Sequence, residues 1–323
     1  MPDASVLVTW PDFDRNGSGT GDRLRAVGCS LRFAPKVEHR TPADMIGLLD
    51  GVAAAIVSTD PFDADVLASA QALRVIARIG VGTDSIDLDV ATRRGVAVCT
   101  TPGANASSTA DHAVALMLAA LRRITEYDAG VRAARWDRTG DATAWELNRA
   151  TVGIVGLGAI GRLVRRRLSG FRAQVLVSDP AAEPEPGSEL VELDELLRRS
   201  HVVSLHLPLT SATRHLIDRR RLALMRPHAV LVNTARGQLV DEDALIDALA
   251  AGRLRAAALD VFEREPPASP RLLELPNVVL TPHIGGVSER SVDEMTRRAT
   301  DAVVDVLAGR VPANLMNPEA LTR

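Results

Sequence analysis

Short apolar runs alternate with amphipathic stretches along the first hundred residues of the chain. The runs lie at Val6–Val8, Ala53–Val57, Arg74–Ile79 and Val96–Cys99. Between them, apolar residues recur at helical spacing, as in Met45–Leu49 and Val66–Ala70. Because short buried strands that alternate with helices form parallel sheets covered on both faces, this pattern predicts a doubly wound α/β domain.

A second unit begins near the turn Thr101–Gly103, where proline and glycine interrupt the pattern. Ser107–Arg122 has the apolar spacing of a long helix. Thr125–Asn148 has no regular pattern, although it contains two tryptophans. Strand-like and helix-like stretches then alternate again from Thr151 to about His283. This region therefore predicts a second parallel-sheet domain.

The last helical pattern, Ser288–Leu307, is too short to form a domain, so we expect it to pack back on the first one. The predicted organisation is a discontinuous substrate domain, residues 1–100 and 287–323, with a dinucleotide-binding domain, residues 101–286, inserted in it. Ala181–Ser188 is rich in proline and glutamate and is predicted to be a surface loop.

A glycine motif occupies the join between a strand and a helix in the second domain. The apolar run Val152–Val155 is followed at once by Gly156–Gly161, and a helical pattern then runs to about Leu168. In such a motif Gly156 permits the tight turn, Gly158 lets the backbone approach a pyrophosphate, and the third glycine lets the helix pack closely on the strand. The helix N-terminus offers free N–H groups to the phosphates. The plain alternative is a glycine-rich turn without a ligand.

An acidic residue stands where a dinucleotide-binding domain needs one. The next predicted strand, Gln174–Ser178, ends at Asp179, which is 179 − 158 = 21 residues after Gly158. A carboxylate at this distance accepts hydrogen bonds from the adenosine ribose hydroxyls and repels a 2′-phosphate. No arginine follows Asp179 directly. The motif therefore predicts NAD, in preference to NADP.

Composition excludes several other classes of protein. The chain has 323 residues, enough for two domains, with a formal net charge of −3. Nucleic-acid and anionic-membrane partners call for a basic surface, so we expect neither. Two cysteines are too few for a disulfide framework, and no Cys/His cluster has metal-ligand spacing, so we expect no metal. The N-terminus lacks the pattern of a signal peptide and no apolar run reaches membrane-spanning length, which predicts a cytoplasmic protein.

Seven motifs in order make the chain resemble one enzyme family over nearly its whole length. Besides the glycine motif they are Gly80–Asp87, Thr101–Asn105, His206–Thr210, Asn233–Gly237, Leu259–Pro267 and Thr281–Gly286. The chain resembles the D-isomer-specific 2-hydroxyacid dehydrogenases, most closely the branch of phosphoglycerate dehydrogenase. The resemblance implies a Rossmann NAD-binding domain inserted in a flavodoxin-like substrate domain. It also implies a homodimer held together through the nucleotide domain, a role that the unpatterned stretch around Trp136 would suit.

The resemblance also implies a catalytic set. His283 is expected to be the general acid/base for the C2 hydroxyl, since imidazole titrates near neutral pH. Glu265 would hydrogen-bond the other ring nitrogen and favour the protonated ring. Arg236 would bind the substrate carboxylate through its always-charged donor fork. Taken locally, His283 could be an ordinary strand-end histidine, Arg236 a surface arginine and Glu265 a solvated loop residue.

Further contacts follow from the same resemblance. Asp260 is expected at the carboxamide side of the nicotinamide, and the backbone N–H groups of Val81 and Gly82, with Asn105, at the substrate. The expected cofactor contacts are Gly156, Gly158, Ala159, Ile160, Gly161, Asp179, His206, Leu207, Pro208, Thr234, Ala235, Asp260, His283, Gly285 and Gly286. The other histidines, at positions 39, 112, 201, 215 and 228, are expected to be structural.

Family differences narrow the substrate without fixing it. Glutamate at position 265 argues against formate and valine at position 81 against phosphite. The loop Ser58–Phe62 lacks the arginine by which phosphoglycerate dehydrogenases bind phosphate, and it carries an acid instead. Asn105 matches that branch, and the chain ends at Arg323 without the regulatory domain of longer members. The sequence favours 3-phosphoglycerate slightly over an unphosphorylated acid such as glycerate/hydroxypyruvate or glyoxylate, or an unusual pathway-specific 2-oxo acid.

A hypothesis of another class stays open beside these. NAD-sensing transcriptional corepressors use the same fold and resemble this family. A binding role of that kind predicts tight NAD binding without useful turnover. The acidic balance of the chain and the lack of a long flexible tail argue against it.

Overall fold

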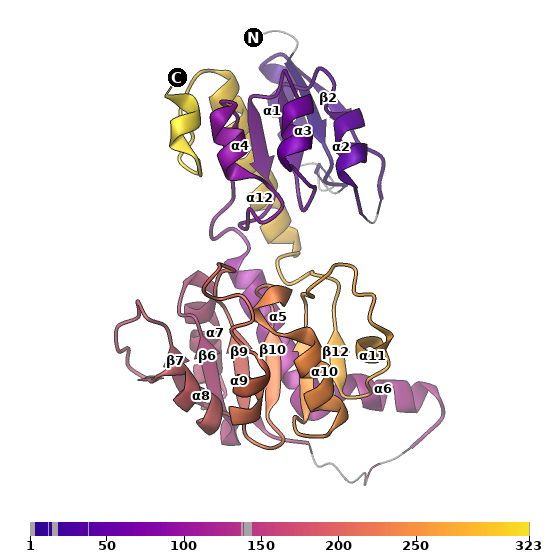
Figure 1. Cartoon of the computed structure of the whole chain (residues 1–323), viewed down its shortest axis with the longest axis vertical. Coiled ribbons are helices and arrows are strands. Elements are labelled where there is room, and N and C mark those ends of the chain that lie inside the picture. Colours follow the sequence, from indigo (N-terminus) through magenta and orange to yellow (C-terminus); the bar gives the residue numbers. More distant parts are fainter. Residues whose placement is uncertain are drawn as a thin grey trace. The chain divides into compact units, whose positions relative to one another are not determined.

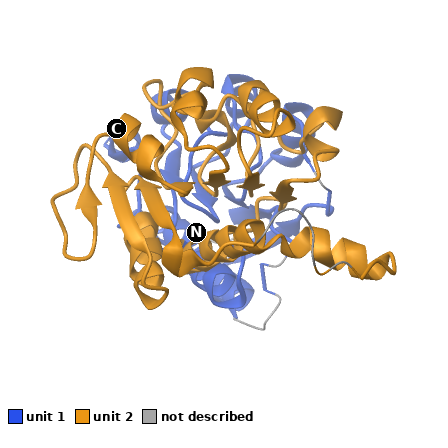
Figure 2. Ribbon diagram, turned by 90° about the horizontal axis from the view of Figure 1, so that it is seen from below, with its two compact units in different colours: residues 1–105, 286–323 blue, residues 106–285 orange. Residues whose placement is uncertain are grey.

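The computed structural model describes residues 4–11, 13–14, 19–37, 39–136, 138 and 144–322. The chain divides into two compact units (Figure 2). Unit 1 consists of Met1–Asn105 and Gly286–Arg323, and unit 2 of Ala106–Gly285. The sequence had placed the corresponding boundaries after residues 100 and 286.

Unit 1 contains a five-stranded sheet in which every pair of neighbours is parallel. Its order, β2-β1-β3-β4-β5, is the flavodoxin-like doubly wound order. The strands are β1 (Ala4–Val8), β2 (Cys29–Phe33), β3 (Ala54–Val57), β4 (Val75–Arg78) and β5 (Ala97–Cys99).

Helices cover both faces of this sheet, as the alternation of its side chains requires. In β1, Val6 and Val8 belong to one apolar cluster with α1 and α12, whereas Leu7 belongs to a second cluster with α2, α3 and α4. The helices are α1 (Thr20–Ala26), α2 (Pro42–Leu48), α3 (Ala64–Ser69), α4 (Leu88–Arg93), α12 (Glu289–Leu307) and the 3₁₀ helix η3 (Pro318–Leu321). The C-terminal helix therefore packs on the N-terminal part of the chain, as predicted.

Unit 2 contains a seven-stranded parallel sheet in the order β12-β11-β10-β9-β6-β7-β8 (Figure 1). Counted within the unit, its first six strands follow the 3-2-1-4-5-6 order of a Rossmann domain, with one further strand at the edge. The strands are β6 (Thr151–Val155), β7 (Gln174–Ser178), β8 (Glu189–Leu190), β9 (Val202–Leu205), β10 (Val230–Asn233), β11 (Ala256–Leu259) and β12 (Val278–Leu280).

The helices of unit 2 also lie on both faces of its sheet. Helices α5 and α7 share one apolar cluster with the strands, and α8, α9 and α10 share the other. The helices are α5 (Ala106–Arg122), α6 (Ile124–Arg132), α7 (Ala159–Gly170), α8 (Leu193–Arg199), α9 (Arg219–Leu224), α10 (Glu242–Ala250), α11 (Pro270–Leu273) and the 3₁₀ helices η1 (Leu147–Arg149) and η2 (Gly237–Leu239). The predicted fold class of two doubly wound parallel-sheet domains is confirmed.

Strand β2 and helix α6 are among the elements absent from the prediction, and both lie at the surface. Strand β2 forms an edge of its sheet and buries only Cys29, so it lacks an apolar run. Helix α6 buries none of its residues, so no apolar stripe announces it. Trp145, in the stretch without a pattern, packs on the core of unit 2, and its ring and that of His201 meet in a T-shaped arrangement. Within the described ranges no helix is long and apolar enough to cross a membrane.

Candidate active site

The predicted site residues of unit 2 gather at one edge of its sheet. Because all the strands are parallel, their carboxyl ends lie at the same edge, where open α/β sheets bind ligands. The strands β6, β7, β9, β10, β11 and β12 are followed there by Gly156, Asp179, His206, Thr234–Arg236, Asp260 and Thr281–His283 respectively. The sheet thus brings residues more than a hundred positions apart to one rim.

The glycine loop between β6 and α7 has the geometry of a phosphate-binding turn. Gly156 has φ +92°, which favours glycine, and a Cβ there would lie 2.4 Å from the carbonyl oxygen of His206. A Cβ on Gly161 would lie 2.1 Å from the carbonyl oxygen of Gly156, so the third glycine allows close packing of the helix. Around Gly158 the space is open within 4 Å, and no side chain caps α7. The cradle therefore fits the pyrophosphate of a dinucleotide.

Asp179 lies beside this loop, half-buried at the end of β7. Its Oδ2 accepts a hydrogen bond from the Leu157 backbone N–H at 2.7 Å, and its Oδ1 accepts one from Ala181 at 2.8 Å. Each carboxylate oxygen has two acceptor positions, so one on each oxygen remains for ribose hydroxyls. The backbone contacts fix the carboxylate next to the glycine turn, as ribose recognition requires.

His206 turns its imidazole into the protein. The residue is 8 % exposed, and its Nε2 lies 2.8 Å from the Ser204 hydroxyl. Burial lowers the pKa of His206 to about 4, because a charged ring loses its hydration there. The imidazole is therefore neutral near pH 7, and the backbone of His206 is the part that packs against Gly156.

His206 also makes the stability of the protein depend on acid. The pKa of His206 is near 6.5 in the unfolded chain and about 4 in the folded chain. The free energy of unfolding therefore rises with pH between these values. From pH 7 to pH 4 this group should remove about 3 kcal/mol from the free energy of unfolding. Urea unfolding of the wild type and His206→Gln at several pH values measures it. An equal loss of unfolding free energy in the wild type and in His206→Gln would contradict this role of His206.

His283 and Glu265 form a hydrogen-bonded pair in the loops after β12 and β11. Nδ1 of His283 lies 2.7 Å from Oε2 of Glu265, and both side chains are 36 % exposed. The other oxygen, Oε1, accepts a hydrogen bond from the Phe262 backbone N–H at 3.2 Å. Glu265 is thus anchored to its own loop, and Nε2 of His283 is the ring nitrogen left to meet a reactant.

Asp260 holds the backbone on which His283 sits. The residue is 1 % exposed, its carbonyl oxygen accepts from the N–H of His283 at 2.8 Å, and its carboxylate accepts from Ile284 at 2.9 Å and Gly285 at 2.7 Å. Burial alone would raise the pKa of Asp260, but hydrogen bonds from His112, the Thr281 hydroxyl and the two backbone N–H groups outweigh it and lower the pKa. The carboxylate therefore stays charged while buried.

A turn after β10 presents Arg236. The buried Asn233 side chain fastens this turn, because its Nδ2 donates to the carbonyl oxygen of Arg236 at 2.8 Å and its Oδ1 accepts from the Ala235 N–H at 3.0 Å. Gln238 then donates to the carbonyl oxygen of Glu263 at 2.8 Å, which ties this turn to the loop after β11. The three predicted catalytic residues thus stand on loops that are cross-linked to one another.

The remaining predicted substrate residues belong to unit 1. Val81 is 43 % exposed in the loop after β4, and Asn105 is half-buried beside Gly286. Asp60 follows β3 at the carboxyl edge of the unit 1 sheet, the edge that also carries Val81. Asp60 is 7 % exposed. Its carboxylate accepts from the Thr9 hydroxyl at 2.6 Å and pairs with the Arg40 guanidinium at 2.9 Å. An arginine therefore reaches this edge from a neighbouring loop, but an acid already neutralises it.

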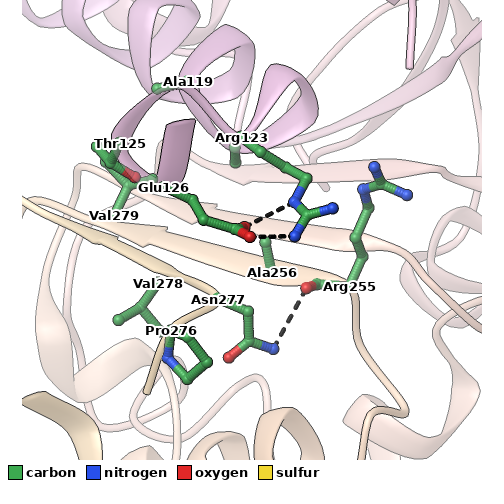
Figure 3. A pocket seen from close by; sticks show the side chains of 11 residues that line it. Ala119, Arg123, Thr125, Glu126, Arg255, Ala256, Pro276, Asn277, Val278 and Val279 are labelled. Atoms are coloured by element: carbon green, nitrogen blue, oxygen red, sulfur yellow. Dashed lines mark hydrogen bonds and ion pairs between the residues drawn. The ribbon is translucent and has the colours of Figure 1, made fainter. Parts of the chain in front are cut away.

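A cavity of about 210 Å³ lies elsewhere in unit 2 (Figure 3). Ala256 and Val278, the first residues of β11 and β12, are among the residues that line it, so it sits at the amino edge of the sheet. Arg123 and Glu126 pair with each other at its wall. Because the catalytic pair and the glycine loop lie at the carboxyl edge, this cavity is separate from the candidate site. In the described part of the chain no cluster of histidine, cysteine and acidic side chains has the arrangement of a metal site.

Comparison with known proteins places this geometry in a family. The profile of the NAD-binding domain of D-isomer specific 2-hydroxyacid dehydrogenases matches residues 114–285. The glyoxylate reductase of Thermococcus litoralis is 41 % identical over 276 residues, which cover 82 % of this chain and 83 % of that protein. The chain belongs to the D-isomer specific 2-hydroxyacid dehydrogenase family.

Two further relatives add detail. The D-3-phosphoglycerate dehydrogenase of Mycobacterium leprae is 45 % identical over 264 residues, which cover 80 % of this chain and 50 % of that protein, so the chain spans about half the length of that relative. The crystal structure of D-lactate dehydrogenase from Aquifex aeolicus with NAD and lactic acid matches with a TM-score of 0.83, 28 % identity, and coverage of 97 % of this chain and 98 % of that one. The chain is an NAD-dependent oxidoreductase, and NAD fits the glycine cradle described above.

Proposed function

We propose that the chain interconverts a small, unphosphorylated 2-oxo acid with the corresponding 2-hydroxy acid, such as hydroxypyruvate with D-glycerate or glyoxylate with glycolate. The observation that carries the reaction is the 2.7 Å contact between Nδ1 of His283 and Glu265, at the sheet edge that also bears the glycine cradle. A histidine whose ring is oriented by a carboxylate can act as a general acid/base. The family membership supports the same reaction class.

His283 handles the proton in this proposal. During reduction, its Nε2–H donates to the C2 oxygen of the substrate as that oxygen gains negative charge. Glu265 keeps Nε2 directed outward through its hold on Nδ1. During oxidation, the neutral ring takes the C2 hydroxyl proton. NADH, when bound, supplies the hydride that C2 accepts.

Arg236 binds and polarises the substrate. Its guanidinium is permanently charged and planar, so it can hold a carboxylate through two parallel hydrogen bonds. We assign Val81 and Gly82 to the same carboxylate and Asn105 to the rest of the substrate. We also assign the cofactor contacts to the residues named from the family motifs. Among these residues, Asp260 also supports the loop that carries His283.

The choice of an unphosphorylated substrate rests on unit 1. A phosphate group needs guanidinium or ammonium charge that is not already neutralised. Arg40 reaches the carboxyl edge of the unit 1 sheet, but its partner Asp60 offsets that charge and would repel a second anionic group on the substrate. The named activity of the Thermococcus relative points the same way. This reverses the slight preference for 3-phosphoglycerate drawn from the sequence.

A second candidate substrate is 3-phosphoglycerate, with 3-phosphohydroxypyruvate as its oxidised form. It is favoured by the relative from Mycobacterium leprae and by Arg78, a second buried guanidinium at the same edge, whose Nε donates to the Ser58 carbonyl oxygen at 2.9 Å. The reaction and the catalytic set are the same for both candidates. The two candidates differ only in whether the protein binds a phosphate group on the substrate.

Consumption of NADH by the purified protein tests this function directly. The panel consists of hydroxypyruvate, glyoxylate, pyruvate, a branched 2-oxo acid and 3-phosphohydroxypyruvate. We expect turnover with hydroxypyruvate or glyoxylate at a higher kcat/KM than with the phosphorylated acid. Silence across the panel, with NADH bound as judged by its fluorescence, would favour an NAD-sensing protein or an unusual substrate.

Asp60→Asn should shift this preference toward the phosphorylated acid. The change removes the charge that offsets Arg40 and keeps an acceptor for the Thr9 hydroxyl. We expect kcat/KM for 3-phosphohydroxypyruvate, relative to hydroxypyruvate, to rise roughly tenfold, which corresponds to about 1.4 kcal/mol.

The double variant Asp60→Asn with Arg40→Gln is the control, because it should lose the gain. A thermal melt checks that the single variant is folded, since an unpaired buried guanidinium destabilises. If the ratio in folded Asp60→Asn equals that of the wild type, or if the wild type already prefers the phosphorylated acid, the proposed substrate class is wrong.

We further propose that two copies of the chain associate through α6. Three apolar side chains on this helix, Ile124, Tyr127 and Val131, are between 36 % and 55 % exposed, and Trp136 beyond it is 79 % exposed. Solvent exposure of a large apolar patch favours its burial against a partner, and a second copy is the partner that the family resemblance implies.

A cytoplasmic location stays a prediction.

A further inference from the structure

His112 lies outside every sequence motif, yet it reaches the support of the catalytic loop. It projects from α5, is 19 % exposed, and places Nε2 3.0 Å from the Thr281 hydroxyl oxygen and 3.3 Å from Oδ1 of Asp260. The Thr281 hydroxyl is itself 2.6 Å from Oδ1 of Asp260 and donates to it, because an ionised carboxylate can only accept. The Thr281 oxygen therefore has lone pairs for a donor, and Nε2–H of His112 is that donor.

The carboxylate that His112 and Thr281 hold has a second task. It accepts the N–H groups of Ile284 and Gly285, the two residues after His283. A second residue of α5, Ser108, donates its hydroxyl to the carbonyl oxygen of Gly285 at 2.8 Å. Ser108 and His112 are four positions apart and so lie on one face of the helix. One face of α5 thus holds the segment after His283 both directly and through Asp260.

The backbone at His283 needs such support. Its φ is +54°, in the left-handed region that non-glycine residues seldom occupy and that persists where surrounding contacts fix it. The direction of the imidazole follows from that backbone conformation. If the Asp260 carboxylate were not held in place, it would release the N–H groups of Ile284 and Gly285. The His283 ring could then move away from Glu265.

We infer that His112 is a positioning residue for the reaction assigned above. His112 fixes the Asp260 carboxylate, and this carboxylate in turn fixes the backbone from His283 to Gly285. That backbone places the His283 imidazole within hydrogen-bonding distance of Glu265. His112 does not touch the reacting atoms in this arrangement. The inference rests on the proposed function for its catalytic consequence, but its structural part concerns unit 2 alone.

Two substitutions separate the hydrogen bond from the bulk of the side chain. His112→Leu removes the donor, whereas His112→Gln keeps an N–H at about the reach of Nε2. We expect kcat for the best 2-oxo acid to fall by roughly 10- to 100-fold in His112→Leu, in proportion to the loss of positioned acid/base catalysis. The kcat of His112→Gln should stay within roughly threefold of that of the wild type.

His201→Leu is the matched control. His201 is a histidine of the same unit whose Nδ1 accepts the N–H of Thr151 at the amino end of β6, far along the sheet from His283. Its loss should lower the melting temperature and leave kcat near that of the wild type. A general loss of stability would move His201→Leu and His112→Leu alike, so the contrast in kcat isolates positioning.

Hydrogen exchange in the protein without substrate gives a readout that does not need activity. The amides of Ile284 and Gly285 should exchange faster in His112→Leu than in the wild type, His112→Gln or His201→Leu. A wild type that turns over none of the acids would contradict the proposed function, whereas unchanged exchange or unchanged kcat in folded His112→Leu would overturn the role of His112. Equal losses in His112→Leu and His112→Gln would overturn it too.

Discussion

His283→Asn should lower kcat by on the order of 100-fold or more, the usual loss when a general acid/base is removed. Asparagine is the appropriate replacement because His283 has φ +54°, a conformation that asparagine adopts more readily than most residues. The amide can neither donate a proton to the C2 oxygen nor accept one from the hydroxyl group. The fold and NADH binding should persist, since the glycine cradle and Asp179 are untouched.

The chain offers a closely matched control for this variant. His228 is exposed and has φ +64°, so His228→Asn makes the same chemical change in the same backbone conformation, away from the candidate site. Steady-state kinetics and NADH fluorescence titration compare the two. A kcat in His283→Asn within a few-fold of that of His228→Asn would mean that another group carries the proton.

Arg236→Gln should reduce kcat/KM for the 2-oxo acid by roughly 100- to 1000-fold, as loss of a preorganised donor to developing negative charge does elsewhere. The substrate carboxylate loses its charged fork, and the C2 oxygen loses a polarising donor. The fastened turn should remain, because Asn233 holds the backbone of this segment and makes no use of the guanidinium. Arg236→Lys should recover little, since a lysine is a point charge without the planar fork.

NADH binding distinguishes this role from a role in cofactor binding. We expect the dissociation constant for NADH to stay near that of the wild type in Arg236→Gln, and the exposed Arg226→Gln to behave as the wild type in every assay. If Arg236→Gln weakens NADH binding and leaves kcat/KM for the acid unchanged at saturating NADH, Arg236 belongs to the cofactor site instead.

Much of the fold was predictable because parallel sheets bury their strands on both faces. The runs at Val6–Val8 and Val152–Val155 are apolar for that reason, and the predicted strands coincide with β1 and β6 to within a few residues. The edge strand β2 and the helix α6 could not be found in this way. Most of their side chains are exposed, so burial imposes little pattern on them.

The candidate site shows a similar division. Strand, glycine turn and acid predicted a dinucleotide cradle on physical grounds, and β6, α7 and Asp179 have that arrangement. The pairing of His283 with Glu265 came from a family motif, because no local pattern distinguishes a catalytic glutamate from a solvated one. The contact between Arg40 and Asp60 joins two loops and depends on tertiary structure, so no spacing along the chain announced it.

His112 was expected to be merely structural, and a signal for its placement was present. With Ser108 it puts polar groups four residues apart, and so on one face of helix α5. Such a pair on a helix that packs against a sheet needs polar partners. Which partners it finds, Thr281, Asp260 and Gly285, follows only from the position of α5 against β11 and β12.

The fate of a labelled hydrogen tests the central claim most directly. The wild-type protein would convert hydroxypyruvate or glyoxylate in ordinary water with NADH that carries deuterium at C4 in both positions, and mass spectrometry would locate the label in the product. Direct hydride transfer predicts one deuterium bound to C2 of the hydroxy acid, since the proton from His283 goes to oxygen. A product whose C2 hydrogen comes from water would contradict the account.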